Sequence, residues 1–223
     1  MRDDGARILA MTTLEVETPH GLARVQLHPA DEPLAGLVLG HGAGGGVETS
    51  DLVAATEAAR FERVSVALVE QPYRVAGRRS SPAARTLDAA WTAVVDHLRD
   101  GEFGGLPLIV GGRSAGARVA CRTAEATGAS AVLCLAFPLQ PPSRRSGTSS
   151  PSRLPELEAV GVPTVVVQGE RDRFGFPPPG PRRDVVAVPG NHGLKADPDA
   201  IRAAISSWLQ GVVAQAAPTS ASD

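Results

Sequence analysis

Short apolar runs recur along the chain, separated by segments whose apolar residues follow a longer, helical period. An uninterrupted run of this length is typical of a β-strand that is buried on both faces of a sheet. The pattern predicts strands of this kind at residues 34–39, 64–69, 106–110, 131–136, 163–167 and 184–188.

The N-terminal part of the chain has a different pattern. Residues 14–17 and 23–27 alternate between apolar and polar side chains, and Pro19-His20-Gly21 lies between them. A period of two is that of a strand with one solvated face, so two such strands around a turn predict a β-hairpin.

Helical periodicity lies between the buried strands. After Ser81 and Pro82, which suit the N-cap and first helical positions, the apolar residues Leu87, Trp91, Val94, Val95 and Leu98 share one face. Further helices are predicted at about 50–60, 117–126, 154–160 and from 197 onward. Alternating strands and helices predict an α/β fold with a mostly parallel central sheet and helices on both faces. Right-handed crossovers place the strand-to-helix loops at the carboxyl edge, where such sheets bind ligands.

The domain organisation is expected to be simple. Of the 223 residues, 12–213 are predicted to form one domain, with a flexible leader at 1–11 and a polar, disordered tail at 214–223. Residues 137–152 are rich in Pro, Ser and Arg and are predicted to be a loop. Only residues 139–152 are available as a lid, so we expect a minimal lid or none.

Composition narrows the function classes. The 22 basic and 24 acidic residues give a formal net charge of −2, which provides no electrostatic footprint for nucleic acid. No apolar run approaches the roughly 18 residues of a membrane span, and Asp3 and Asp4 stand where a signal peptide carries positive charge. We therefore expect a cytoplasmic protein with neither nucleic acid nor membrane as partner. Cys121 and Cys134, both in apolar segments, are expected to be buried free thiols.

The sequence Gly112-Arg113-Ser114-Ala115-Gly116 follows a predicted strand and precedes a predicted helix. This Gly-x-Ser-x-Gly pattern in this setting is that of a nucleophile elbow, a sharp turn that exposes the serine hydroxyl above the sheet. Side chains two residues on either side of Ser114 would collide with neighbouring backbone, which explains the glycines.

A serine hydroxyl needs a base within hydrogen-bond reach and a third group that orients the base. Of the five histidines, His192 alone lies in a loop after the last predicted strand and before the last helix. Asp172 follows the preceding strand, with Glu170 as the alternative acid. The chain order Ser114, Asp172, His192 is that of an α/β-hydrolase triad.

Acyl transfer also requires donors for the developing oxyanion. We expect the backbone N–H of Ala115, the residue after the nucleophile, to be one donor. The other donor is expected from the loop His41-Gly42-Ala43-Gly44, at the N–H of Ala43. The motif implies neither a metal nor a cofactor.

Several side chains at the predicted carboxyl edge are candidates for binding substrate. Arg113 flanks the nucleophile, Tyr73 and Arg74 follow one strand, and Phe137 follows another. Arginine binds carboxylates and phosphates through two parallel hydrogen bonds, so these arginines favour an anionic substrate. The alternative is that Arg113 is structural and pairs with an acid on a neighbouring loop.

A rival interpretation uses the glycine loop. Gly40, Gly42 and Gly45 form a G-x-G-x-x-G pattern after a strand, and Glu70 ends the next strand. This is a dinucleotide-binding fingerprint in which Glu70 would bind a ribose hydroxyl. It leaves Ser114, Asp172 and His192 unexplained.

Five stretches carry a family resemblance: 41–45, 111–118, 135–139, 168–172 and 190–192. With them the chain resembles small, nearly lidless α/β-hydrolases related to dienelactone hydrolases. It is most similar to a branch shared with a testis-expressed protein and a subunit of a histone-acetyltransferase complex. Dienelactone hydrolases proper use a cysteine nucleophile, whereas this chain has Ser114. The resemblance therefore implies the fold more than a dienelactone substrate, and it raises a third hypothesis, a catalytically silent interaction subunit.

Taken together, these patterns predict a serine hydrolase that cleaves a small-molecule carboxylic ester, lactone or thioester. Its oligomeric state is not encoded in any of them.

Overall fold

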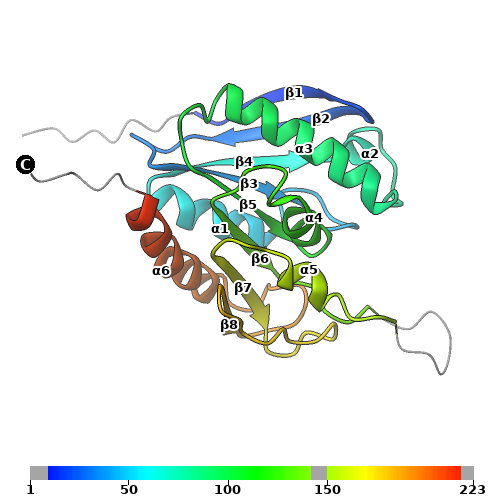
Figure 1. Ribbon diagram of the computed structural model, residues 1–223, viewed down its shortest axis with the longest axis vertical. Coiled ribbons are helices and arrows are strands. Elements are labelled where there is room, and N and C mark those ends of the chain that lie inside the picture. The colour runs from blue at the N-terminus through cyan, green and yellow to red at the C-terminus, as the bar shows by residue number, and fades with distance from the viewer. Residues whose placement is uncertain (1–9, 142–149, 217–223) are drawn as a thin grey trace, which may run out of the picture.

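The computed structural model describes residues 10–141 and 150–216, and within them one sheet of eight strands organises the molecule (Figure 1). Its strand order is β1-β2-β4-β3-β5-β6-β7-β8. The strands are β1 (Thr12–Thr18), β2 (Gly21–His28), β3 (Ala35–Gly40), β4 (Val64–Glu70), β5 (Leu108–Arg113), β6 (Ala131–Leu135), β7 (Thr164–Gly169) and β8 (Arg183–Val188).

The sheet is mostly parallel. β1 and β2 form the predicted hairpin, and β2 pairs antiparallel with β4. The pairs from β4 through β3, β5, β6 and β7 to β8 are all parallel. The predicted α/β fold is therefore confirmed, and the carboxyl ends of the six parallel strands meet at one edge.

Helices cover both faces of the sheet. They are α1 (Ser50–Phe61), α2 (Pro72–Val75), α3 (Ala84–Asp100), α4 (Ala115–Thr123), α5 (Leu154–Glu158) and α6 (Pro198–Ala216). Helices α1 and α6 pack together on one face, and α3, α4 and α5 cover the other (Figure 1).

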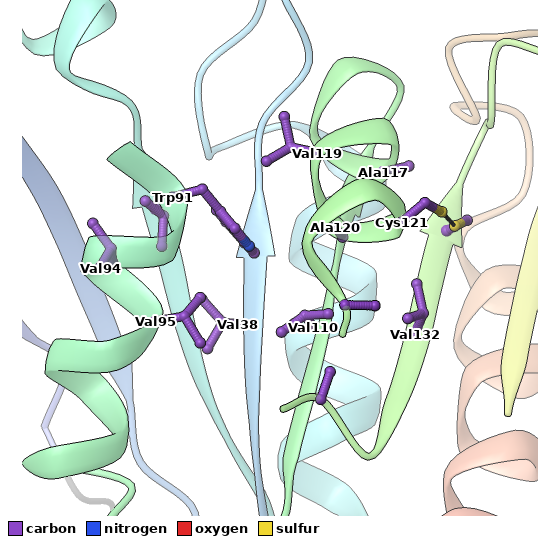
Figure 2. Close-up of a cluster of buried hydrophobic side chains, with 14 of the residues drawn as sticks. Val38, Trp91, Val94, Val95, Val110, Ala117, Val119, Ala120, Cys121 and Val132 are labelled. Atoms are coloured by element: carbon purple, nitrogen blue, oxygen red, sulfur yellow. Dashed lines mark hydrogen bonds between the residues drawn. The ribbon is translucent and has the colours of Figure 1, made fainter. Parts of the chain in front are cut away.

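Two hydrophobic layers result from the alternation of side chains along each strand. In β3, Val38 faces the α3/α4 layer, whereas Leu37 and Leu39 face the α1/α6 layer. Figure 2 shows the first layer, in which Trp91 of α3 and Ala120 of α4 approach the valines of the sheet. The fully buried Trp91 fills the space between α3, α4 and the end of β3. This packing fixes α4, and with it the turn that precedes α4.

Three elements differ from prediction in boundaries that bear on the site or its supporting helices. β5 continues through Gly111 and Gly112 to Arg113, because hydrogen bonding to β3 and β6 outweighs the low strand propensity of glycine. Helix α4 begins at Ala115 and ends at Thr123 instead of spanning 117–126. Helix α3 begins at Ala84, since the carbonyl of Ala83, not of Ser81, accepts its first helical hydrogen bond.

Other differences lie in the loops and at the ends. The four-residue helix α2 lies directly after β4, in a segment where no helix was predicted. Helix α6 continues to Ala216, three residues into the segment predicted as a tail. The remainder of that tail, residues 1–9 of the predicted leader and residues 142–149 of the predicted loop lie outside the described residues.

The two cysteines are free and buried, as predicted, and their sulfur atoms lie 3.5 Å apart between α4 and β6. Across residues 10–141 and 150–216, no helix combines the length and the apolarity that crossing a membrane requires.

Candidate active site

Ser114 occupies the junction between β5, which ends at Arg113, and α4, which begins at Ala115. Its backbone has φ 51° and ψ −103°, a conformation that L-residues rarely adopt. The surrounding structure holds this turn, because the Ser114 N–H donates to the Leu135 carbonyl at 2.9 Å. Residues kept in such sparsely populated conformations cluster at functional sites.

The two flanking glycines are required by the closeness of β3. A Cβ atom on Gly116 would lie 2.3 Å from the Gly40 carbonyl oxygen, and one on Gly112 would lie 2.5 Å from the same oxygen. These contacts are with backbone, which cannot move aside without breaking the β3–β5 pairing. The collision expected from the sequence is therefore present in the structure.

Three loops at the carboxyl edge bring Ser114, His192 and Asp172 together. Ser114 Oγ lies 3.0 Å from His192 Nε2, and His192 Nδ1 lies 2.8 Å from Asp172 Oδ2. The Asp172 side chain is 1% exposed and that of His192 is 18% exposed. The carboxylate is thus shielded from water, while the imidazole and the serine stay accessible. Glu170, the alternative acid, is exposed.

The hydrogen-bond partners determine which ring nitrogen of His192 carries the proton. A carboxylate only accepts, so Nδ1–H donates to Asp172 and the lone pair on Nε2 faces the Ser114 hydroxyl. The edge of the ring packs against Phe174, with ring centroids 4.4 Å apart. Arg173 lies over the Phe174 ring at 4.9 Å.

Gln168 holds the acid and was not recognised as a site residue from the sequence. Its fully buried side-chain amide donates to Asp172 Oδ2 at 2.9 Å and to the carbonyls of Phe137 and Gly175. The other oxygen, Asp172 Oδ1, accepts from the Phe174 N–H at 2.9 Å. Only the four-residue separation of Gln168 from Asp172 could have pointed to this role.

The loop after β3 is held by two aromatic side chains. His41 Nδ1 donates to the Gly42 carbonyl at 2.8 Å, and its Nε2 accepts from the Gln71 N–H at 3.1 Å. The Tyr73 hydroxyl donates to the Ala43 carbonyl at 3.1 Å. Burial lowers the pKa of His41 and raises the pKa of Tyr73, so the imidazole stays neutral and the phenol keeps its proton.

The two residues expected to form an oxyanion site, Ala43 and Ala115, follow β3 and β5, which are neighbours in the sheet. The N–H of Ala115, at the first position of α4, has no acceptor within the helix. Ala43 lies in the exposed part of the loop after β3. Because Gly40 of β3 pairs with Gly112 of β5, this loop starts beside the serine turn.

The structure separates the four side chains that were candidates for binding substrate. The Arg113 guanidinium faces inward, with Nε 2.8 Å from Asp51 Oδ2, so this is the structural alternative. Tyr73 is buried and supports Ala43. Phe137 is fully buried in the core and presents no surface to a ligand. Arg74, in α2, remains half-buried beside the loop.

The dinucleotide interpretation does not agree with the geometry. In the fingerprint the glycines open the helix directly, but α1 begins at Ser50, five residues beyond Gly45. The space beside the first two glycines is filled by protein, since a Cβ on Gly40 would meet Trp91 and one on Gly42 would meet Arg113. Glu70 lies 3.6 Å from Arg24. Among the described residues no cluster of three His, Cys, Asp or Glu side chains suits a metal ion.

Comparisons with known proteins agree with this fold. Solved structures of similar fold include XC6422 from Xanthomonas campestris, an α/β serine hydrolase without lid, with 17% identity, a TM-score of 0.70 and 90% and 94% of the two chains covered. Est1E from Butyrivibrio proteoclasticus has 14% identity and a TM-score of 0.73, covering 91% of this chain and 99% of its own. A dienelactone hydrolase from Anabaena variabilis has 14% identity and a TM-score of 0.70, covering 91% and 97%.

No curated protein matches the chain significantly. The family model described as "Alpha/beta hydrolase domain" matches residues 33–178, which extend from β3 past the acid Asp172. Since this match spans well over half of the chain, the protein belongs to the alpha/beta hydrolase domain family.

Proposed function

We propose that the protein is a serine hydrolase that cleaves small carboxylic esters, lactones or thioesters through an acyl-enzyme. One observation carries the proposal: an unbroken chain of contacts from Ser114 Oγ to His192 and on to Asp172, at 3.0 and 2.8 Å. Both distances suit hydrogen bonds that transfer or orient a proton.

The first half of the reaction follows from these contacts. Ser114 Oγ attacks the substrate carbonyl carbon while His192 Nε2 accepts the hydroxyl proton. Asp172 holds the imidazole in this tautomer and stabilises its charged form. The carbonyl oxygen becomes an oxyanion, which the N–H groups of Ala43 and Ala115 bind. His192 then donates the proton to the leaving alcohol or thiol, and the acyl group remains on Ser114.

Water completes the cycle in the second half. His192 Nε2 accepts a proton from a water molecule, whose oxygen attacks the acyl-enzyme carbonyl at the same oxyanion site. The carboxylic acid leaves as Ser114 recovers its proton from His192. The neutral state of His41 and the proton on Tyr73 keep the Ala43 loop in one conformation during both halves.

The fold alone does not determine the substrate class, so the choice of esters, lactones or thioesters needs further support. One neighbour of similar fold is an esterase domain from Rhodothermus marinus and another is a dienelactone hydrolase, which supports an ester or a lactone as the substrate. Thioesters react through the same attack. The narrower kinship with the testis-expressed and acetyltransferase-complex branch rests on the sequence motifs alone, and a triad with intact contacts favours an enzyme over a silent subunit.

The decisive experiment is labelling with a fluorophosphonate probe, which reacts with an activated serine hydroxyl. The wild-type protein is expected to label, and Ser114→Ala is expected not to label. Equal labelling of the two proteins, or no labelling of the wild type, would contradict the proposal. With a turnover substrate such as p-nitrophenyl acetate, loss of a triad member is expected to lower kcat on the order of 10⁴-fold.

A further inference from the structure

The Arg113 side chain contacts two further loops of the site besides its own turn. Its NH2 group donates to the main-chain carbonyl of His192 at 3.0 Å. Its NH1 group lies against Gly42, where a Cβ atom would be 2.7 Å away. Its Nε lies 2.8 Å from Asp51 Oδ2. One guanidinium therefore joins the nucleophile turn to the histidine loop, the glycine loop and the start of α1.

Asp51 is a buried counter-ion for this arginine. Its side chain is 0% exposed, and its Oδ1 accepts the N–H of Leu52 at 3.0 Å. The Nε–H of Arg113 does not point straight at Asp51 Oδ2. The two groups therefore form an ion pair without an aligned hydrogen bond. A buried carboxylate without a partner is strongly unfavourable, so the buried Asp51 carboxylate requires the positive charge of Arg113 beside it. Asp51 thereby keeps the guanidinium in the orientation that reaches His192.

Arg113 contacts the backbone of His192 and not its ring, so the contact acts on the position of the histidine loop. Asp172 orients the imidazole ring, but it does not fix where the loop carries the ring relative to Ser114. The Arg113 hydrogen bond ties that position directly to the nucleophile turn, because Arg113 directly precedes Ser114 in the chain. The distance from Nε2 to Oγ thus depends on a side chain that touches neither reacting atom.

We propose that Arg113 is a positioning residue which, with Asp51 as its counter-ion, docks the His192 main chain against the nucleophile turn. The inference rests on the proposed function, since it concerns the same triad. Arginine is suited to the task because its planar fork presents several donors in fixed directions, whereas lysine is a single point of charge. A displacement of about 1 Å in a reacting group costs on the order of 10²-fold in rate.

Arg113→Met is expected to lower kcat on the order of 10²-fold with little change in KM, because the guanidinium is already engaged by Asp51 and the His192 carbonyl. Arg113→Lys cannot reach Asp51 and His192 in the same way, so kcat is expected to fall. Because lysine keeps the positive charge beside Asp51, the fall is expected to be smaller than in Arg113→Met. The double variant Asp51→Asn/Arg113→Met removes the unpaired buried charge. Its kcat is expected to stay low, because the hydrogen bond to His192 is still absent.

The matched control is Arg122→Met. Arg122 is also in a partly buried ion pair, bonded to Asp88 at 2.9 Å, with a side-chain exposure of 19% against 17% for Arg113. It lies on α4, and neither Arg122 nor its two acidic partners contacts a triad member. Its loss is expected to lower Tm by a similar amount while leaving kcat close to that of the wild type.

The measurements are the rate constant for fluorophosphonate labelling, kcat and KM with p-nitrophenyl acetate, and Tm for each protein. Slow labelling of Arg113→Met beside near-normal labelling of Arg122→Met would support the proposal. Equal rates for these two variants would overturn it and leave the proposed function standing. If the wild type itself does not label, the proposed function fails and this inference fails with it. If Arg113→Met does not fold, Arg113→Lys and Arg122→Lys are compared, and equal kcat values overturn the proposal.

Discussion

Gln168 and His192 donate to the same oxygen of Asp172. The Gln168 side-chain amide lies 2.9 Å from Oδ2, and His192 Nδ1 lies 2.8 Å from it. Reversing the Gln168 amide would direct its oxygen at a carboxylate and at two carbonyls, so the assignment of its nitrogen follows from the contacts. The neutral amide of Gln168 thus holds Asp172 Oδ2, the same oxygen that accepts from the His192 imidazole.

Gln168→Met is expected to lower kcat about 10-fold, because Asp172 loses the donor that orients it. The carbonyls of Phe137 and Gly175 also lose a partner, so the free energy of unfolding is expected to fall by about 1–3 kcal/mol. Gln168→Glu should be less active than Gln168→Met at pH 8 and should recover toward the activity of wild type at pH 6, since only a protonated Glu can donate to Asp172. A pH profile of kcat relative to wild type checks this. Identical profiles for both variants would contradict it.

Asp172 and Glu170 are expected to differ sharply. Asp172→Asn replaces an acceptor with a group that also donates, which favours the wrong imidazole tautomer and should lower kcat on the order of 10⁴-fold. Glu170→Gln is expected to stay within about twofold of wild type, because Glu170 is exposed and such surface changes are usually small. Steady-state kinetics of both variants provide the measurement. The reverse ranking would identify Glu170 as the acid.

His41 is expected to make stability depend on pH. Burial lowers its pKa below the ordinary value of 6.5, so below pH 6.5 the unfolded chain binds a proton that the folded protein does not. The free energy of unfolding is therefore unaffected by His41 above pH 6.5 and falls as the pH drops below 6.5. His28 has a pKa lowered in the same direction and adds to the effect. Chemical denaturation at pH 7.5 and pH 5.5 should give a smaller difference for His41→Gln than for wild type, and an equal difference would refute this account.

Short acyl groups are expected to react faster than long ones. The segment 139–152 is the only part of the sequence that was expected to cover the site, and it is too polar to form an apolar tunnel. The value of kcat/KM for p-nitrophenyl acetate or butyrate should exceed that for the laurate ester in monomeric solution. Faster turnover of the laurate ester would contradict the expected preference for short acyl groups.

The anionic-substrate hypothesis now depends on Arg74 rather than Arg113. The Arg113 guanidinium faces Asp51, whereas the half-buried Arg74 is in none of the ion pairs among the described residues. An anionic ester is expected to exceed a neutral ester of similar size in kcat/KM at low salt and to lose part of that advantage at high salt. Arg74→Ala should abolish the preference. A preference that is absent, or unchanged in that variant, returns Arg74 to a structural role.

The sequence predicted the elements that depend on local pattern. The apolar runs of β3, β4 and β6 and the alternation of β1 and β2 each appear where they were expected, within one or two residues. The contacts among Ser114, Asp172 and His192 also agree with the expected order, because parallel strands bring their carboxyl ends to one edge.

The features that the sequence did not predict depend on partners far away in the chain. Asp51 is an ordinary acid in the first turn of a helix, and only the fold brings it to Arg113, 62 positions later. Phe137 follows a strand at the catalytic edge, yet its ring turns into the core because the chain bends at Ala136, where φ is 48°. Neither periodicity nor spacing records such a bend.

The pairing of Gly40 with Gly112 has a consequence for how this site can change over evolution. The two residues are partners in the β3–β5 register, and the loop that carries Ala43 and the turn that carries Ser114 begin immediately after them. Their relative placement is therefore inherited from the hydrogen-bond ladder of two central strands, not from the length of any loop. Beyond Tyr73 and Phe137, which hold Ala43 and Gln168, the loops after β4 and β6 can lengthen, shorten or acquire new side chains without disturbing this ladder. Selectivity and chemistry are thus separable parts of this molecule, and new substrates can be accommodated by loop variation alone.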